Sequence, residues 1–265
     1  MKPEISPGIS PDITFGLAGR VCIVTGGAQG IGEACIRRFA RENAKVVVAD
    51  VDDSRGAALA SEVNGLFVHC DVGDKTQVDA LVSKTIAAHG QIDVLVNNAG
   101  IFKAADFLDV SEADFDAVLR INLKGSFLVG QAVAREMAKA GKGSIINMSS
   151  VNGVLAIPTI ASYNVSKGGI NQLTRVMALA LVDKGIRVNA VAPGTIATEL
   201  AAKAVLTSDE AKAKIMSRTP MKRLGQPSEI ADTVAYLASD AASYITGEIV
   251  VVDGGRMVLN YTVNI

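Results

Sequence analysis

The sequence predicts an α/β protein in which a single domain is built on a doubly wound, seven-stranded parallel sheet with helices on both faces. Short apolar runs rich in Val, Ile and Ala alternate along the chain with longer stretches of helical spacing. A glycine-rich turn joins the first of these runs to the first helical stretch. The 265 residues are 49% apolar and 4% aromatic, which is enough for one large core of aliphatic side chains.

Each expected strand is a short run of β-branched and other aliphatic residues, as is typical of parallel sheets covered by helices on each side. The strands are expected at 21–25, 45–50, 66–71, 92–97, 143–150, 186–192 and 248–252. Stretches with apolar residues at helical spacing lie between them. These helices are expected at 33–42, 54–63, 74–89, 111–140, 161–184 and 227–239.

One long segment between the last two strands does not fit this alternation. Residues 199–226 are rich in Ala and Lys and lack a strong apolar face, so we expect 195–226 to form a partly mobile lid over the site. Its cations either attract an anionic substrate or form a solvated helix face; they are Lys203, Lys212, Lys214 and Arg218.

The two ends lie outside the main domain, which we assign to residues 19–255. Residues 1–18 contain three prolines and no apolar stretch, which predicts a loosely held arm and excludes a signal peptide. The tail, residues 256–265, is unusually apolar for a chain end, so we expect it to pack on something. Our hypothesis is that it reaches a neighbouring subunit near the active site of that subunit.

Composition excludes several classes of function. A net charge of −1 without a basic run argues against a nucleic-acid partner, and no apolar run approaches the ~18 residues of a membrane span. Cys22, Cys35 and Cys70 have no CxxC spacing and are expected to be core hydrophobes, so we expect a cytoplasmic protein. His69 and His89 have no ligand-spaced partner, which argues against a metal site and a Ser-His-Asp hydrolase.

The first strand is followed at once by Gly26-Gly-Ala-Gln29-Gly30-Ile31-Gly32 and then a helix. Strand, glycine turn and helix form the context of a phosphate-binding loop, because glycines admit a diphosphate and the helix start offers free N–H groups. The spacing is Gly26-x3-Gly30-x-Gly32, which differs from GxGxxG. The alternative is a turn whose glycines serve only close contact between strand and helix.

Two carboxylates end the next two strands. Asp50 lies 18 residues after Gly32 (50 − 32), close to the ~20 typical of a ribose-binding acid, and it would repel a 2′-phosphate. Gln29 stands in the glycine loop and no cation immediately follows Asp50, so the sequence favours NAD over NADP. The alternative is that Asp50 only caps the next turn. Asp71 is in position to face an adenine amino group.

Amide side chains occupy two further positions. Asn97-Asn98-Ala99-Gly100 ends the fourth strand, where ligands of open α/β sheets bind, and we expect Asn98 to brace neighbouring loops. Asn122 interrupts the apolar face of the helix expected at 111–140. It is either a satisfied buried amide or the site of a local widening that holds a water.

Tyr163 and Lys167 are four residues apart and share one face of the expected helix. A nearby ammonium favours the phenolate, lowers the tyrosine pKa and so makes a general acid/base for an alcohol or a carbonyl. Chance pairs on solvated helix faces are the alternative. Ser149 and Ser150, at the end of the fifth strand, can each bind a substrate oxygen, and periodicity does not separate them.

Taken together, these residues resemble the short-chain dehydrogenase/reductase family, whose fold is a Rossmann sheet. The resemblance runs from about Leu17 to Gly255 and selects Ser150, which lies 13 residues before Tyr163 (163 − 150). The matching motifs occur in the family's order: Thr25-Gly-Gly-Ala-Gln-Gly-Ile-Gly32, Asn97-Asn-Ala-Gly100, Asn122, Ser150, Tyr163-x3-Lys167, Pro193-Gly194 and Asp253-Gly254-Gly255.

The resemblance implies roles for these residues. Tyr163 is the general acid/base, Lys167 lowers its pKa and binds the nicotinamide ribose, and Asn122 holds a water. Substrate contacts are expected from Ser150, Asn152 and Tyr163. Cofactor contacts are expected from Gly26, Gln29, Gly30, Ile31, Gly32, Asp50, Val51, Asp71, Val72, Asn98, Ala99, Gly100, Tyr163, Lys167, Pro193, Gly194, Ile196 and Thr198. A homotetramer formed through 111–140 and 161–184 is also implied.

The predicted reaction is reversible hydride transfer between a secondary alcohol and NAD. A pocket bordered by Asn152, Val154, Pro158 and 195–216 suggests a small or medium alcohol, polyol or sugar derivative. Within the enzyme class the alternative is a 3-oxoacyl-carrier-protein reductase, against which Asp50 argues. The non-enzyme alternative is a dinucleotide-binding sensor or scaffold, which would not need Ser150, Tyr163 and Lys167 together.

Overall fold

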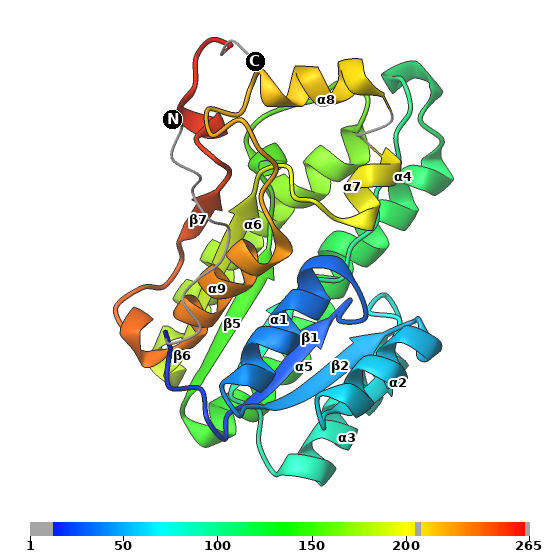
Figure 1. Ribbon diagram of the computed structural model, residues 1–265. Helices are drawn as coiled ribbons and strands as arrows, with labels where there is room; N and C mark the ends of the chain where they lie inside the picture. Colours follow the sequence, from blue (N-terminus) through cyan, green and yellow to red (C-terminus); the bar gives the residue numbers. More distant parts are fainter. Residues whose placement is uncertain (1–12, 205–207, 263–265) are drawn as a thin grey trace.

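The computed structural model describes residues 13–204 and 208–262 (Figure 1). One seven-stranded parallel sheet with the order β3-β2-β1-β4-β5-β6-β7 forms its centre, which confirms the predicted fold class. The strands are β1 (Val21–Thr25), β2 (Lys45–Asp50), β3 (Leu66–His69), β4 (Val94–Asn97), β5 (Gly143–Met148), β6 (Ile186–Pro193) and β7 (Ile249–Val252).

Helices cover both faces of the sheet. They are α1 (Gly30–Arg41), α2 (Asp53–Glu62), α3 (Lys75–His89), α4 (Glu112–Val118), α5 (Gly125–Ala140), α6 (Ala161–Leu181), α7 (Glu199–Ala204), α8 (Asp209–Met216) and α9 (Pro227–Ala238). Side chains alternate along β1, so that Cys22 and Val24 join the core under α1 and α9, whereas Ile23 joins the core under α3, α5 and α6. No helix among the described residues is long and apolar enough to cross a membrane.

The strand order places the candidate site. It reverses at β1, which lies between β2 and β4. Ligands of open α/β sheets bind outside the carboxyl ends of the strands at such a switch point. Figure 1 shows α7 and α8 at the end of the molecule toward which β5 and β6 run. Cys70, Asp71, Ser149 and Ser150 lie just beyond their strands, at this same edge.

The helix expected at 111–140 is three elements. A π-helix, Leu119–Lys124, separates α4 from α5. The widening inferred from Asn122 is therefore confirmed, and Asn122 is fully buried within it. The Ser126 hydroxyl donates to the Asn122 carbonyl at 2.7 Å, which gives the irregular turn a hydrogen bond from a side chain.

The expectation of a loosely held N-terminal arm is wrong for residues 13–18, whereas 1–12 lie outside the described residues. The Glu42 carboxylate accepts the N–H groups of Phe15 and Leu17 at 2.8 and 3.2 Å. The Arg38 guanidinium donates to the Ile13 carbonyl at 2.9 Å. Because Arg38 also pairs with Glu42 at 2.8 Å, a buried ion pair on α1 holds this segment.

The lid segment contains two short helices, α7 and α8, and residues 205–207 between them lie outside the described residues, as does the side chain of Lys203. In the tail, Arg256–Val258 form a 3-10 turn. Val258 and Tyr261 are 89% and 71% exposed, so these two apolar side chains do not pack within the described chain. Residues 263–265 lie outside it.

Candidate active site

The structure confirms that the glycines of this turn serve close contact between strand and helix, and the phosphate-binding explanation stays a prediction. A Cβ on Gly26 would lie 2.8 Å from the Ala99 Cα, and one on Gly32 would lie 2.0 Å from the Gly26 carbonyl oxygen, so close contact alone requires these glycines. Gly26 and Gly30 have φ angles of +60° and +59°, which glycine adopts at little cost. Gly30 instead faces Thr198, whose Cγ2 would lie 3.4 Å from an added Cβ.

The start of α1 fits a diphosphate. Gln29 occupies the N-cap, and its side chain makes no capping hydrogen bond. The Gln29 amide oxygen instead accepts from Arg55 at 2.9 Å. Among the described residues no side chain therefore caps this helix, whose first N–H groups and dipole suit an anion. This arrangement fits the nicotinamide dinucleotide implied by the sequence.

The Asp50 carboxylate holds two backbone segments. Its Oδ2 accepts the Ala28 N–H of the glycine turn at 2.9 Å, and its Oδ1 accepts the Asp52 N–H at 3.1 Å. The capping alternative is therefore part of its role. Each carboxylate oxygen keeps a further lone pair for ribose hydroxyls, because an ionised carboxylate has about four acceptor positions. The neighbouring Val51 is exposed.

Asp71 has a partner that sequence reasoning missed. The Arg120 guanidinium, from the π-helix, lies 2.9 Å from its Oδ2, and Oδ1 accepts the Gly73 N–H at 2.8 Å. An approaching adenine would meet a carboxylate already bound on both oxygens. The Val72 side chain is buried against Gly125, so only its backbone remains for a ligand.

The end of β4 holds the glycine turn in place. The Asn98 side-chain amide donates to the carbonyls of Thr25 and Gly26 at 3.0 and 2.9 Å, which confirms that Asn98 braces neighbouring loops. Asn97 is buried and donates to Asn147 at 2.9 Å, so its side chain points into the core instead of along a cofactor path. Ala99 and Gly100 follow at the sheet edge, with Ala99 against Gly26.

Ser150, Tyr163 and Lys167 come together beyond β5. The hydroxyls of Ser150 and Tyr163 are hydrogen-bonded. The Lys167 ammonium lies 5.4 Å from the centre of the Tyr163 ring and donates to the Met148 carbonyl at 2.6 Å. Ser149 takes a different direction, since its hydroxyl donates to the Asn171 amide oxygen of α6. Geometry thus separates the two serines where periodicity did not.

Burial dominates the acid–base properties of this group. It raises the pKa of the Tyr163 hydroxyl, and the hydrogen bond with Ser150 opposes that effect. It also lowers the pKa of Lys167 to about 8. The expected lowering of the Tyr163 pKa by Lys167 is therefore wrong for the protein without cofactor. The ammonium faces the tyrosine ring and a backbone carbonyl, and desolvation is the larger of the two effects on the Tyr163 pKa.

Asn122 connects the site to the end of β4. Its amide donates to the Ile101 carbonyl at 3.0 Å and to the Ser166 hydroxyl at 3.1 Å, and its oxygen accepts the Ile101 N–H at 2.8 Å. The interpretation of a satisfied buried amide is thus confirmed alongside the widening. Ser166 in turn donates to the Tyr163 carbonyl at 2.8 Å, so Asn122 reaches the catalytic helix through one hydroxyl.

One residue beside Tyr163 was not indicated by the sequence. Phe102 packs its ring edge-on against Tyr163, with ring centres 5.5 Å apart at an interplanar angle of 62°. It follows Ile101, which Asn122 fixes, but no spacing rule links Phe102 to Tyr163. Asn152 donates its N–H to the Ser150 hydroxyl at 3.1 Å, while its own amide oxygen is buried without a hydrogen-bond partner among the described residues.

The loop after β6 contains the last of the predicted cofactor residues. Pro193 ends the strand, and a Cβ on Gly194 would lie 2.8 Å from the Asp253 Cα. Ile196 is buried and lies against Gly225, so its side chain is part of the hydrophobic core. The Thr198 hydroxyl caps α7 by accepting the Ala201 N–H at 3.1 Å.

Gly168 and Gly169 follow Lys167 on α6, and other segments of the same chain lie close to both. A Cβ on Gly169 would lie 2.7 Å from the Leu123 side chain of the π-helix. A Cβ on Gly168 would meet only the Gly153 carbonyl oxygen, at 3.6 Å. The segments that lie close to these two glycines therefore belong to the same chain.

Comparisons with known proteins agree with this geometry. A family model described as "Enoyl-(Acyl carrier protein) reductase" matches residues 26–257. The chain is 41% identical over 247 residues to 3-oxoacyl-[acyl-carrier-protein] reductase FabG of Thermotoga maritima, covering 91% of this chain and 99% of that protein. It is 40% identical over 248 residues to glucose 1-dehydrogenase 2 of Bacillus subtilis, covering 90% and 95%.

A solved structure shares the whole fold. The crystal structure of a gluconate 5-dehydrogenase from Burkholderia cenocepacia, in complex with NADP and tartrate, has a TM-score of 0.89. It is 37% identical and covers 92% of this chain and 98% of its own. The glycine turn, the Ser150, Tyr163 and Lys167 group and these matches lead to one conclusion: the chain is an oxidoreductase of the short-chain dehydrogenase/reductase family, whose members bind a nicotinamide dinucleotide.

Proposed function

We propose that the protein interconverts a secondary alcohol and its ketone with NAD as the preferred cofactor. The observation that carries this proposal is the hydrogen-bonded pair of Ser150 and Tyr163 hydroxyls beside the buried ammonium of Lys167. This group stands at the same sheet edge as the glycine turn, where an open α/β sheet binds its ligand.

Each side chain has one task in this proposal. The nicotinamide, when bound, supplies the hydride acceptor for the alcohol or the hydride donor for the ketone. Ser150 orients the substrate oxygen, and the Tyr163 oxygen takes its proton or returns it. Lys167 holds the cofactor ribose, and its charge then favours the phenolate of Tyr163. Asn122, in the widened turn, holds a water through which Lys167 exchanges protons with solvent.

The test of the reaction is a screen of secondary alcohols and ketones that follows NADH absorbance, with NADP as the control cofactor. We expect turnover by the wild-type protein and a loss of at least 10²-fold in kcat for Tyr163→Phe, since general acid–base catalysis contributes about 10²–10⁴-fold. NAD binding, measured by calorimetry, should survive the substitution. A variant that keeps near-normal kcat would refute the role of Tyr163.

The preference for NAD rests on Asp50. A carboxylate at the end of β2 accepts ribose hydroxyls and repels a 2′-phosphate. We expect Asp50→Ala to lower the ratio of kcat/KM with NAD to kcat/KM with NADP. An unchanged ratio would count against this role. The variant also loses the hydrogen bonds to Ala28 and Asp52, so its stability is measured in parallel.

The alternative within the enzyme class is a 3-oxoacyl-carrier-protein reductase. The 41% identity to the Thermotoga maritima protein favours it, and Asp50 argues against it when that activity depends on NADPH. Assays with a 3-oxoacyl thioester separate the two functions. A non-catalytic dinucleotide sensor would keep cofactor binding and show no turnover with any member of either substrate set.

Substrate size and polarity are proposed from the residues beside Ser150. Asn152, with its unpaired amide oxygen, and Val154 offer one polar and one apolar contact. A small or medium polyol or sugar derivative suits this mixture, and the name of the Bacillus subtilis relative points to the same class. A cytoplasmic location remains the prediction from sequence.

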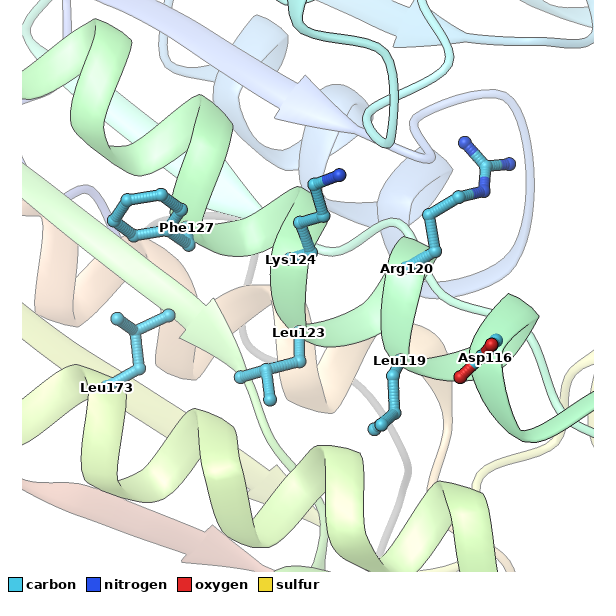
Figure 2. A pocket seen from close by; sticks show the side chains of 7 residues that line it. All are labelled: Asp116, Leu119, Arg120, Leu123, Lys124, Phe127 and Leu173. Carbon is cyan, nitrogen blue, oxygen red and sulfur yellow. The ribbon is translucent and has the colours of Figure 1, made fainter. Parts of the chain in front are cut away.

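We also propose a homotetramer formed through the α4–α5 segment and α6. Four apolar side chains on these elements are at least 43% exposed: Phe127, Val165, Val176 and Leu179. Figure 2 shows Leu119 and Leu123 pointing from the π-helix toward α6, whereas Arg120 and Lys124 point to the other side. An apolar face of this kind is typical of a subunit interface.

A further inference from the structure

The connection between β4 and α4 is fixed on both sides of Phe102. The Ile101 N–H donates to the Asn122 amide oxygen at 2.8 Å, and the Ile101 carbonyl accepts from the Asn122 amide nitrogen at 3.0 Å. Further along the connection, the Ala105 N–H donates to the Thr159 carbonyl at 3.0 Å. The backbone that carries Phe102 is therefore held by the π-helix on one side and by the segment leading into α6 on the other.

The segment leading into α6 is in turn fixed to that helix. The Asn164 side-chain amide donates to the Ile157 carbonyl at 2.9 Å, and the Asn164 N–H donates to the Ile160 carbonyl at 3.0 Å. Thr159 lies between these two carbonyls in the chain, and Asn164 directly follows Tyr163. The support of the β4–α4 connection is therefore fixed relative to the candidate catalytic tyrosine.

From this backbone the half-buried Phe102 ring meets the Tyr163 ring. The ring centres are 5.5 Å apart at an interplanar angle of 62°, an edge-on arrangement that aromatic pairs prefer. The Tyr163 hydroxyl is hydrogen-bonded to Ser150, and the Lys167 ammonium lies 5.4 Å from the centre of the Tyr163 ring. One hydrogen bond at the tip of a side chain leaves the side chain able to change rotamer, whereas close packing of its ring restricts that change.

We infer that Phe102 is a positioning residue that keeps the Tyr163 ring in the orientation in which its hydroxyl meets Ser150. This role rests on the proposed function, in which the Tyr163 oxygen exchanges a proton with the substrate. Proton transfer requires that oxygen to be within hydrogen-bond reach of the substrate, and a small displacement lowers the rate strongly. Removal of the Phe102 ring should therefore slow the chemical step and leave the binding of substrate and cofactor unchanged.

The kinetic test compares Phe102→Ala, Phe102→Leu and Phe102→Tyr with the wild type. Phe107→Ala is the matched control, because Phe107 lies in the same connection and is 73% exposed. Hydride transfer from an alcohol that the wild type oxidises is measured in single turnovers, since product release often limits kcat. Calorimetry measures the Kd for NADH, and steady-state kinetics measure the KM for the alcohol.

We expect Phe102→Ala to slow hydride transfer by about tenfold or more, because a misplacement of about 1 Å costs up to about 10²-fold. KM and the Kd for NADH should stay within about twofold of the wild-type values. Phe102→Leu should lose part of the rate, Phe102→Tyr should restore it because the ring is kept, and Phe107→Ala should leave it unchanged. A raised KM with an unchanged rate of hydride transfer would overturn the positioning role.

A double variant shows whether Phe102 acts through Tyr163. Once the Tyr163 hydroxyl is removed, its orientation no longer matters, so Phe102→Ala should cause no further loss of rate in a Tyr163→Phe background. Equal fold-losses in the wild-type and Tyr163→Phe backgrounds would contradict action through Tyr163.

Crystal structures test the same role without any turnover. In the wild type the Tyr163 and Ser150 hydroxyls should be hydrogen-bonded, and in Phe102→Ala the Tyr163 ring should turn away or occupy two orientations. Phe102→Leu, which keeps an apolar side chain, takes its place if circular dichroism shows that Phe102→Ala is unfolded. An unchanged Tyr163 ring would overturn the role of Phe102. A displaced ring in a protein that turns over no alcohol would support this role and refute the proposed reaction.

Discussion

At the residue scale, the candidate catalytic side chains stand where their surroundings disfavour charge. Lys167 is 4% exposed and its pKa is lowered to about 8 by burial, while burial raises the pKa of Tyr163. Burying this cation lowers the stability of the folded protein. The proposed reaction requires the lysine, so the protein retains it despite this loss. A bound cofactor would place hydroxyls and charge beside these two groups.

This cost predicts that Lys167→Met stabilises the cofactor-free protein at pH 7. A lysine whose pKa falls from about 10.5 to about 8 opposes folding by roughly 3 kcal/mol below pH 8. Methionine fills a similar volume without charge, although the Met148 carbonyl loses its donor, at a cost of about 1–3 kcal/mol. We expect a net gain of about 0.5–2 kcal/mol in the free energy of unfolding, measured by denaturant titration, together with lost turnover.

The pH dependence provides the control. Between pH 8 and 10.5 the unfolded lysine keeps its proton and the folded one loses it, so the opposing contribution shrinks as pH rises. The advantage of Lys167→Met over the wild type should therefore fall between pH 7 and pH 10. The buried cysteines titrate in both proteins and cancel in this difference. If the stability difference between Lys167→Met and the wild type stays constant or grows with pH, burial does not lower the pKa of Lys167 as we describe.

The sequence predicted those side chains whose neighbours follow from helix or strand spacing. Tyr163 and Lys167 share a helix face, and Asp50 ends a strand, so their positions follow from local rules. Phe102 and Arg120 were missed because each meets its partner only after a separate segment returns to it. The direction of the Tyr163 pKa was also missed, since burial is a property of the whole site.

At the element scale, α6 is positioned by a close contact with the turn that follows β5. A Cβ on Gly153 would lie 2.6 Å from the Asn171 amide nitrogen and 2.9 Å from the Lys167 carbonyl oxygen. That turn carries Asn152 and follows Ser150, so the same contact sets the distance between Ser150 and the catalytic helix.

Two glycine substitutions test this contact. Gly153→Ala should lower the free energy of unfolding by about 1–3 kcal/mol through overpacking and should reduce kcat as Ser150 moves away from Tyr163. Gly168→Ala, on the facing side, meets only an atom at 3.6 Å and should raise stability by about 0.5–1 kcal/mol because alanine favours a helix. Denaturant titration and steady-state kinetics measure both. Equal effects of the two substitutions would contradict the role of the contact.

Element boundaries were predictable to the extent that periodicity marks them. Five of the six helical ranges and the seven strands were close, whereas the range 111–140 is divided by a π-helix, whose widening a single buried amide, Asn122, indicated. The held segment before β1 was not predictable, because its partner is a buried pair, Arg38 and Glu42, on the far side of the glycine turn. Nor did the Ala- and Lys-rich stretch mark where α7 and α8 begin and end.

At the scale of the whole molecule, helices cover both faces of the sheet and the candidate site lies at its switch point, but several apolar side chains on the outer surface of α6 are exposed. Val176 and Leu179 are 56% and 80% exposed and lie three residues apart on the helix. Isolated apolar residues on a surface need no explanation, whereas several on neighbouring elements indicate an interface.

If the proposed tetramer forms through α6, we expect Val176→Asp combined with Leu179→Asp to convert it into smaller species without unfolding the chain. Two carboxylates placed in an apolar interface would each lose solvation without a partner, at a cost of at least 2 kcal/mol per subunit. Sedimentation velocity measures the mass, and circular dichroism checks the fold. Tyr244→Asp is the matched control, since Tyr244 is fully exposed and lies outside α6. A wild-type protein that sediments as a monomer, or a double variant that keeps the tetramer mass, would remove α6 from the assembly.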